Sequence, residues 1–240
     1  MKNYGMPFIS LLLAISIQSC YINLGESVSG NGHVVEETRS AGDFHSLKVS
    51  SGIDVFINQG ENEFLRLEAD ENLLEHIKTE ITDGELKIYT DVNIRMAKSK
   101  KVYLGYKQLK SIHISSAGDV NGENAMHSND LKLRLSSAGD LKLEVIADEI
   151  DLDISSSGNV TLAGKTGYLK AGLSSAGNLN AFDLQAARAD VSVSSAGDAR
   201  IYVTDEARFK CSSAGDIVYR GNPKILDMHT SSAGDIRKKD

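Results

Sequence analysis

The sequence predicts an all-β fold, a single-stranded parallel β-helix with coils of about 18–21 residues. The first observation behind this prediction is a turn motif of the form Ser-Ser-Ala-Gly-Asp, which recurs seven times at a nearly constant interval. The second is the alternation of apolar and polar residues between the copies, as at Leu141, Leu143 and Val145. A fixed period is typical of solenoids, and a period of two is typical of strands. Because 41% of the 240 residues are hydrophobic, the chain can also fill such a core.

The motif glycines mark the seven copies and lie 18 to 21 residues apart: Gly118, Gly139, Gly158, Gly177, Gly197, Gly215 and Gly234. This period is too short for helical-hairpin repeats of about 33 residues or more, and the pattern of leucine-rich repeats is absent. Three short strands in each period would form one coil of a β-helix, in which every strand is hydrogen-bonded to its equivalents in the coils above and below.

The repeated motif is expected to form the corner of each coil. Stacked coils lie about 4.8 Å apart, so every corner should have nearly the same backbone shape. We expect the glycine to supply a positive φ and the preceding small residue to keep the corner narrow. Continued alternation places the second serine of each pair inside the coil, in a structural and not a nucleophilic role. These serines are Ser116, Ser137, Ser156, Ser175, Ser195, Ser213 and Ser232.

The residue after each motif glycine is expected to point outward and to form a column of Asp and Asn side chains, here called the Asx column. Its members are Asp119, Asp140, Asn159, Asn178, Asp198, Asp216 and Asp235. Asx side chains bond turn backbone, which favours a structural role. The alternative is a calcium ladder. Known calcium-binding nonapeptide repeats have the order G-G-x-G-x-D-x-U-x, whereas here Asp directly follows Gly. The sequence therefore favours no metal and no cofactor.

The N-terminal segment differs from the rest of the chain. Lys2 precedes the apolar run 8–17, which is too short to span a bilayer and is typical of a signal peptide. The residues Ile17 and Ser19 before Cys20 resemble a bacterial lipobox, in which the cysteine is lipidated. The alternative is an ordinary secretory signal with a chance cysteine. We expect an outer-membrane lipoprotein that faces the periplasm or the cell surface and is attached to the membrane through Cys20.

The expected organisation has three parts: a lipoprotein signal peptide at 1–20, a tether and N-terminal cap at 21–42, and a β-helical domain at 43–240. Cys211 occupies an apolar strand position and is expected to be a core residue. The net charge of −7 argues against a nucleic-acid partner. The six histidines have no ligand spacing that would predict zinc.

The pattern is looser before Gly118. The 66 residues between Gly52 and Gly118 have room for about three longer coils, with a tight turn at Asp83 and Gly84. A short helical stretch is expected within 71–78. Strands are expected at 53–57, 63–69, 85–90 and 101–104.

Three pieces of this looser region occur in an order that is specific although each piece is weak. The pattern F..L.V.SG..V.I.QG begins at Phe44 and is followed by NLL..I, by DGEL.I and then by the repeats. This order resembles the putative auto-transporter adhesin head GIN domain, common in Bacteroidetes lipoproteins, over about residues 43–236. The resemblance implies a right-handed β-helix and an adhesin-like protein, and it implies no catalytic residues.

The leading functional hypothesis is a non-enzymatic cell-envelope lipoprotein with a structural, adhesion or ligand-binding role. The alternative is a carbohydrate-active β-helix enzyme. Such enzymes gather Asp or Glu with Arg or Lys in one cleft, whereas here the acids are spread one to a coil. A glycan or a protein is the expected kind of ligand, and the solenoid ends offer a route to oligomers. Five tyrosines that could form a stacking face are scattered, which favours packing: Tyr103, Tyr106, Tyr168, Tyr202 and Tyr219.

Overall fold

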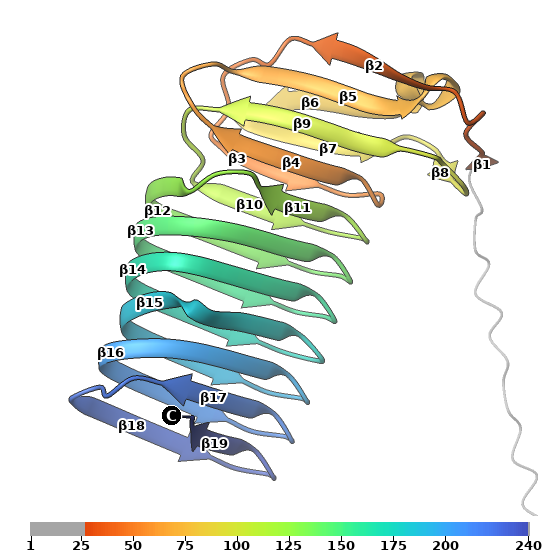
Figure 1. Cartoon of the computed structure of the whole chain (residues 1–240). Coiled ribbons are helices and arrows are strands. Elements are labelled where there is room, and N and C mark those ends of the chain that lie inside the picture. Colours follow the sequence, from red (N-terminus) through yellow and green to blue (C-terminus); the bar gives the residue numbers. More distant parts are fainter. Residues whose placement is uncertain (1–26, 240) are drawn as a thin grey trace, which may run out of the picture.

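The computed structural model describes residues 27–239 and confirms the predicted β-solenoid, with about seven turns (Figure 1). Strands make up 65% of the chain and helix 3%. The stacked part contains ten strands: β10 (Ser111–Ile114), β11 (Asp119–Gly122), β12 (Met126–Leu135), β13 (Asp140–Ile154), β14 (Asn159–Leu173), β15 (Asn178–Val193), β16 (Asp198–Cys211), β17 (Asp216–Arg220), β18 (Ile225–Thr230) and β19 (Asp235–Lys238).

Each central coil is one long strand and not three short ones. β13 and β14 have 15 residues each and run from one motif to the next without a break in their parallel pairing. The bends of these two coils do not shift the register, whereas β-bulges interrupt it between β14 and β15 and between β15 and β16. At the corners the same stacking continues, since the backbone N–H of Asn178 donates to the carbonyl of Gly158 at 3.0 Å.

Every second side chain of the long strands points into the core, as the alternation predicts. One buried column runs through Leu135, Ile154, Leu173 and Val193 to Cys211, whose side chains are at most 2% exposed. Burying such columns of aliphatic side chains supplies the main stabilising free energy of the stack, at about 25 cal/mol per Å² of apolar surface. Cys211 is therefore a core residue, as expected.

The first part of the described chain is a cap on the solenoid. Its elements are β1 (Ser27–Val28), β2 (Val34–Arg39), β3 (Ser46–Val49), β4 (Asp54–Gln59), β5 (Phe64–Asp70), the 3₁₀ helix η1 (Glu71–His76), β6 (Ile77–Thr82), β7 (Glu85–Thr90), β8 (Asn93–Ile94) and β9 (Lys100–Tyr106). The strands and the helical stretch expected from the sequence are present within a few residues of their expected bounds.

The expectation of about three longer coils in this region is correct only in part. β7 and β9 stack in parallel on β3 and β4, as coils do, but the strands beyond them do not. β5 pairs with β2 and β9 in antiparallel fashion, and β6 pairs antiparallel with β7. The reason lies in the turn between β6 and β7, where Asp83 and Gly84 both have positive φ values, 52° and 74°. Two such residues form the tight turn that matches strand twist in a hairpin. The chain therefore folds back on itself here and does not continue as a coil.

Residues 34–39 belong to the cap and not to a tether, because β2 pairs with β5 along its whole length. Arg39, at the end of β2, closes the outer end of the cap. Its guanidinium donates to the carbonyls of Ile77 at 2.5 Å and Leu74 at 2.8 Å. The expected signal peptide, its cleavage site and Cys20 lie outside the described residues.

The predicted role of the motif glycines is wrong. Their φ values are not positive; instead the second serine of most motifs is left-handed, as at Ser175 (67°) and Ser195 (61°). All of the motif glycines but Gly234 are buried, and they face the preceding coil. A Cβ on Gly139 would overlap the carbonyl oxygen of Gly118 and lie 2.6 Å from Ile114 Cγ2. Glycine is required here because of close approach between coils and not because of its backbone freedom.

The predicted inward position of the second serines is also wrong. Ser116, Ser175, Ser195, Ser213 and Ser232 are exposed, and Ser137 and Ser156 are half-buried. The alternation stops at the corner because left-handed residues turn the side chains away from the core, and the glycine takes the inward place. The half-buried Ser156 hydroxyl still donates to the Ser136 carbonyl of the preceding coil at 3.2 Å.

Candidate functional site

The Asx column lies along one corner of the solenoid, with its members in register from coil to coil. Asp119 pairs with Asp140, and the pairing continues without a shift down to Asp216 and Asp235. Asp54 of β4 adds one further position next to Asp119, in the cap. The sequence did not identify Asp54, although the degenerate motif before it was the available signal.

The side chains in the upper half of the column bond to the neighbouring coil. The Asn159 amide donates to Asp140 Oδ1 at 2.7 Å, and the Asn178 amide donates to Asn159 Oδ1 at 2.9 Å. Asp119 Oδ1 accepts from the backbone N–H of Asp140 at 3.1 Å. Burial, together with the nearby charges of Asp140 and Asp54, raises the pKa of Asp119. These bonds link coils to one another, which is a structural role.

The lower half of the column has a different partner. Arg237 Nη1 lies 2.7 Å from Asp235 Oδ2 and 3.8 Å from Asp216 Oδ1. Asp216 and Arg237 line a hollow beside the column, together with Arg200, Arg220 and Phe182. Arg237 provides beside Asp216 and Asp235 the positive charge that calcium ions would provide in a calcium ladder. Across residues 27–239, no group of three or more His, Cys, Asp or Glu side chains is placed to hold a metal ion.

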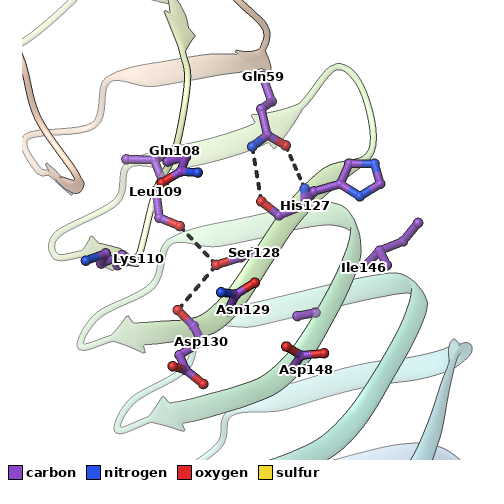
Figure 2. Close-up of a pocket in the computed structure, with 11 residues that line it drawn as sticks. Gln59, Gln108, Leu109, Lys110, His127, Ser128, Asn129, Asp130, Ile146 and Asp148 are labelled. Carbon is purple, nitrogen blue, oxygen red and sulfur yellow. Dashed lines mark hydrogen bonds between the residues drawn. The ribbon is translucent and has the colours of Figure 1, made fainter.

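A cleft of about 590 Å³ lies where the cap meets the solenoid (Figure 2). Its floor is the first half of β12, residues 126–130. This segment pairs with β13 on one side, whereas β10 covers only residues 132–135 of β12 on the other. In the described part of the chain, no strand pairs with residues 126–130 on the cap-facing side. The junction therefore contains a strand edge that, within residues 27–239, has no strand partner on this side.

One side chain of the cap reaches down to this edge, as the dashed lines in Figure 2 show. Gln59 Nε2 donates to the His127 carbonyl at 3.0 Å, and the His127 N–H donates to Gln59 Oε1 at 2.6 Å. The Gln59 amide thus forms the pair of bonds that a neighbouring strand would form. The Ser128 hydroxyl donates to the Leu109 carbonyl at 3.2 Å and further fixes the floor.

Other side chains of the cleft have no partner. Among residues 27–239, the side chains of Lys110, Asn129 and Asp148 form neither a hydrogen bond nor an ion pair, and all three are exposed. Ile146, which is 46% exposed, adds an apolar surface beside them. A cationic, an amide, a carboxylate and an aliphatic group thus face one small space. Such a set suits the binding of a polar ligand more than catalysis.

The sequence did not identify this cleft, because its lining comes from four separate segments of the chain. The available signal was the stretch HSND at 127–130, where polar residues interrupt an alternating strand. The tyrosines form no single stacking face. Tyr106 and Tyr219 are buried, and Tyr103 stacks on Phe56 with 5.1 Å between the ring centroids.

Cys211 is not a reactive site. Its side chain is 2% exposed, and its Sγ–H donates to the Gly215 carbonyl at 2.9 Å. Burial raises the pKa of the thiol, and a neutral buried thiol is a poor nucleophile.

Comparison with known proteins gives one family and several solved structures. The family model described as putative auto-transporter adhesin, head GIN domain, matches residues 43–223. A putative adhesin from Bacteroides fragilis is 19% identical, with a TM-score of 0.84 over 88% of this chain and 100% of its own. A putative adhesin from Parabacteroides merdae is 20% identical, with a TM-score of 0.73, and the match covers 90% of this chain and 100% of that protein. A putative lipid binding protein from Parabacteroides distasonis is 21% identical, with a TM-score of 0.75, and the match covers 90% of this chain and 100% of that protein. At these identities the likeness shows the fold alone.

No curated protein matches the chain. Within residues 27–239, no helix has the length and apolar character needed to cross a membrane.

Proposed function

Because this chain belongs to the putative auto-transporter adhesin, head GIN domain family, we propose that it is a non-enzymatic adhesin-type head of the cell envelope. It is attached to the outer membrane through a lipid on Cys20, and it binds an extended segment of a partner protein in the junction cleft. The observation that carries the proposal is the uncovered edge of β12 beside polar side chains that have no partner of their own.

An extended peptide can add a strand to an exposed sheet edge, with main-chain bonds giving affinity and side-chain contacts giving specificity. The cleft has both parts. The incoming strand would replace the Gln59 amide at His127 and pair with the edge at residues 126–130. Lys110 and Asp148 offer charges of opposite sign to the ligand's side chains. A glycan is less favoured, because no Phe or Tyr lines the cleft to stack on a sugar ring.

The hollow beside the lower Asx column gives the enzyme alternative its best location, since three carboxylates and three arginines line it. Arg237 forms ion pairs with both Asp216 and Asp235, so these carboxylates already have a partner within the stack. This arrangement supports a structural role for the acids.

The ligand part of the proposal is tested by panning a random-peptide display library against the purified full chain. Peptides that bind the cleft should lose binding when Asp148 is replaced by Lys. The matched control is Glu144→Lys, which makes the same charge change on the same strand at an exposed residue without a partner. Selected peptides that bind Asp148→Lys as tightly as the wild type would contradict the proposal.

The anchor is tested separately in cells. Labelled palmitate should be incorporated into the wild-type chain and not into Cys20→Ser, and only the wild type should sediment with outer membranes. A wild-type chain without label would favour an ordinary secreted protein.

A further inference from the structure

The solenoid ends without a cover at its C-terminal end (Figure 1). All six residues of β18 are exposed, although Leu226 and Met228 occupy the core positions of buried Ala207 and Phe209 in the coil before. Leu226 is 41% and Met228 46% exposed. The core columns therefore open onto solvent, next to a strand edge that no strand of the described chain pairs with.

The opposite end is closed. Its outer strand β2 carries Glu36, Glu37 and Arg39, and its Arg39 bonds across to η1 and β6. Charged side chains on an outer strand prevent edge-to-edge pairing. A head-to-tail contact, in which the open end of one copy meets the cap of another, is disfavoured for this reason.

The two strands of the open end, β18 and β19, differ in how many charged side chains they carry. β19 and the residue after it carry Arg237, Lys238 and Lys239, a charged edge that protects itself. β18 is less protected, since Ile225, Leu226 and Met228 make half of its six residues apolar and it carries no Lys or Arg. An unprotected apolar edge is a template for another strand.

We propose that β18 pairs with β18 of a second copy, in an antiparallel arrangement about a twofold axis at Met228. In this register Leu226 lies opposite Thr230 of the second copy, so that core-facing residues of both chains meet. Asp227 lies opposite His229 of the second copy, and the reverse pair forms across the axis. The carboxylate and the imidazole, which lie 3.3 Å apart within one strand, can therefore pair between the two copies instead. A shift of one residue would place core-facing residues opposite solvent-facing ones.

Other centres are worse. An axis at Asp227 would set two carboxylates directly against each other, and like charges directly opposite destabilise a strand pair. An axis at His229 would leave Asp227 opposite Ser231, without the imidazole. The contact is isologous, so it closes at a dimer and forms no fibre. It leaves the junction cleft open, because that cleft is at the other end of the solenoid (Figure 1).

The register is tested by oxidative cross-linking of the full chain with Cys20→Ser, in which buried Cys211 is the only native thiol. Met228→Cys should form a disulfide-linked dimer, because residues directly opposite in an antiparallel pair have Cβ atoms about 4.5–5.5 Å apart. Ile225→Cys is the control. Ile225 is more exposed, at 57%, but in the proposed register it lies opposite residue 231 of the second copy and far from residue 225 of that copy. Equal cross-linking of both variants, or of neither, overturns the proposal.

The oligomeric state is measured by analytical ultracentrifugation from about 1 to 100 μM. The wild type should be a dimer in this range, and Met228→Lys should weaken the dimer at least tenfold without lowering the melting temperature. Met96→Lys, which changes a 73% exposed residue in the cap, should remain dimeric. A wild type that is monomeric throughout, or a dimer that Met228→Lys leaves intact, overturns the proposal and leaves the proposed ligand cleft untouched.

Discussion

Replacing single motif glycines by alanine should destabilise the protein by amounts that follow the space at each corner. At Gly139 an added Cβ would overlap the Gly118 carbonyl oxygen and lie 2.6 Å from Ile114 Cγ2. At Gly197 the contacts are looser, with 3.2 Å to the Gly177 carbonyl oxygen and 3.2 Å to Val193 Cγ1. The two sites have the same motif and neither has a positive φ. They differ in steric room, which is the quantity under test.

The magnitudes follow from two opposing effects. Overpacking a filled interior costs about 1–3 kcal/mol, and Gly139 meets backbone that cannot move without shifting a whole coil. Alanine in place of glycine at a compatible φ gains about 0.4–1 kcal/mol by restricting the unfolded chain. We expect Gly139→Ala to lose about 2 kcal/mol and Gly197→Ala to change stability by less than about 0.5 kcal/mol.

Urea unfolding followed by circular dichroism measures both variants against the wild type. Gly177→Val offers a third point, because a Cβ at Gly177 would lie 2.5 Å from Ile154 Cγ2 and a branched side chain would add to the overlap. Its loss should be about 1–3 kcal/mol. Equal losses for Gly139→Ala and Gly197→Ala would refute the steric explanation and favour a common backbone requirement.

Three further predictions concern carboxylates. Burial alone would raise the pKa of Asp70, but hydrogen bonds from the backbone N–H groups of residues 99, 32 and 98 lower it. Asp70→Asn should therefore lower the free energy of unfolding by about 1.5–3 kcal/mol at pH 7. This stabilisation is present above the unfolded pKa of 3.8 and is lost as the pH falls through the lower folded value, so urea midpoints of wild type and variant should converge in strong acid. Asp140→Asn should raise stability by about 0.3–1 kcal/mol in the same assay, because it removes a charge that repels Asp119 and keeps an acceptor for Asn159. Thermal midpoints of the wild type should be equal in EDTA and in millimolar calcium, and a calcium-dependent rise that Asp216→Asn abolishes would restore the calcium ladder.

The solenoid could be predicted from the sequence because its period and its alternation are both local signals. The column from Asp119 to Asp235 follows from the same period, since nearly equal spacing keeps equivalent residues in register and β-bulges take up the extra residues. The corner itself could not be predicted. Alternation cannot be extended through residues such as Ser195, whose left-handed φ of 61° turns the side chain outward.

The cap and the cleft could not be predicted from local sequence signals, because both depend on contacts between distant segments. The Asp83 and Gly84 turn was visible in the sequence, but its consequence, a hairpin that replaces coils, depends on which strands pair at a distance. The cleft depends on a strand that is missing above residues 126–130, together with a glutamine 68 residues before His127 that reaches its edge. Neither fact follows from the composition of any one segment.

The central claim is that the junction cleft is the adhesive site of an envelope-anchored head. Its most direct test is the attachment of cells that express the full chain to a surface coated with the selected peptide, measured under gentle flow. Cells with the wild-type chain or with Glu144→Lys should attach equally. Cells with Asp148→Lys at equal surface level should detach. Attachment of Asp148→Lys cells at the wild-type level would contradict the claim.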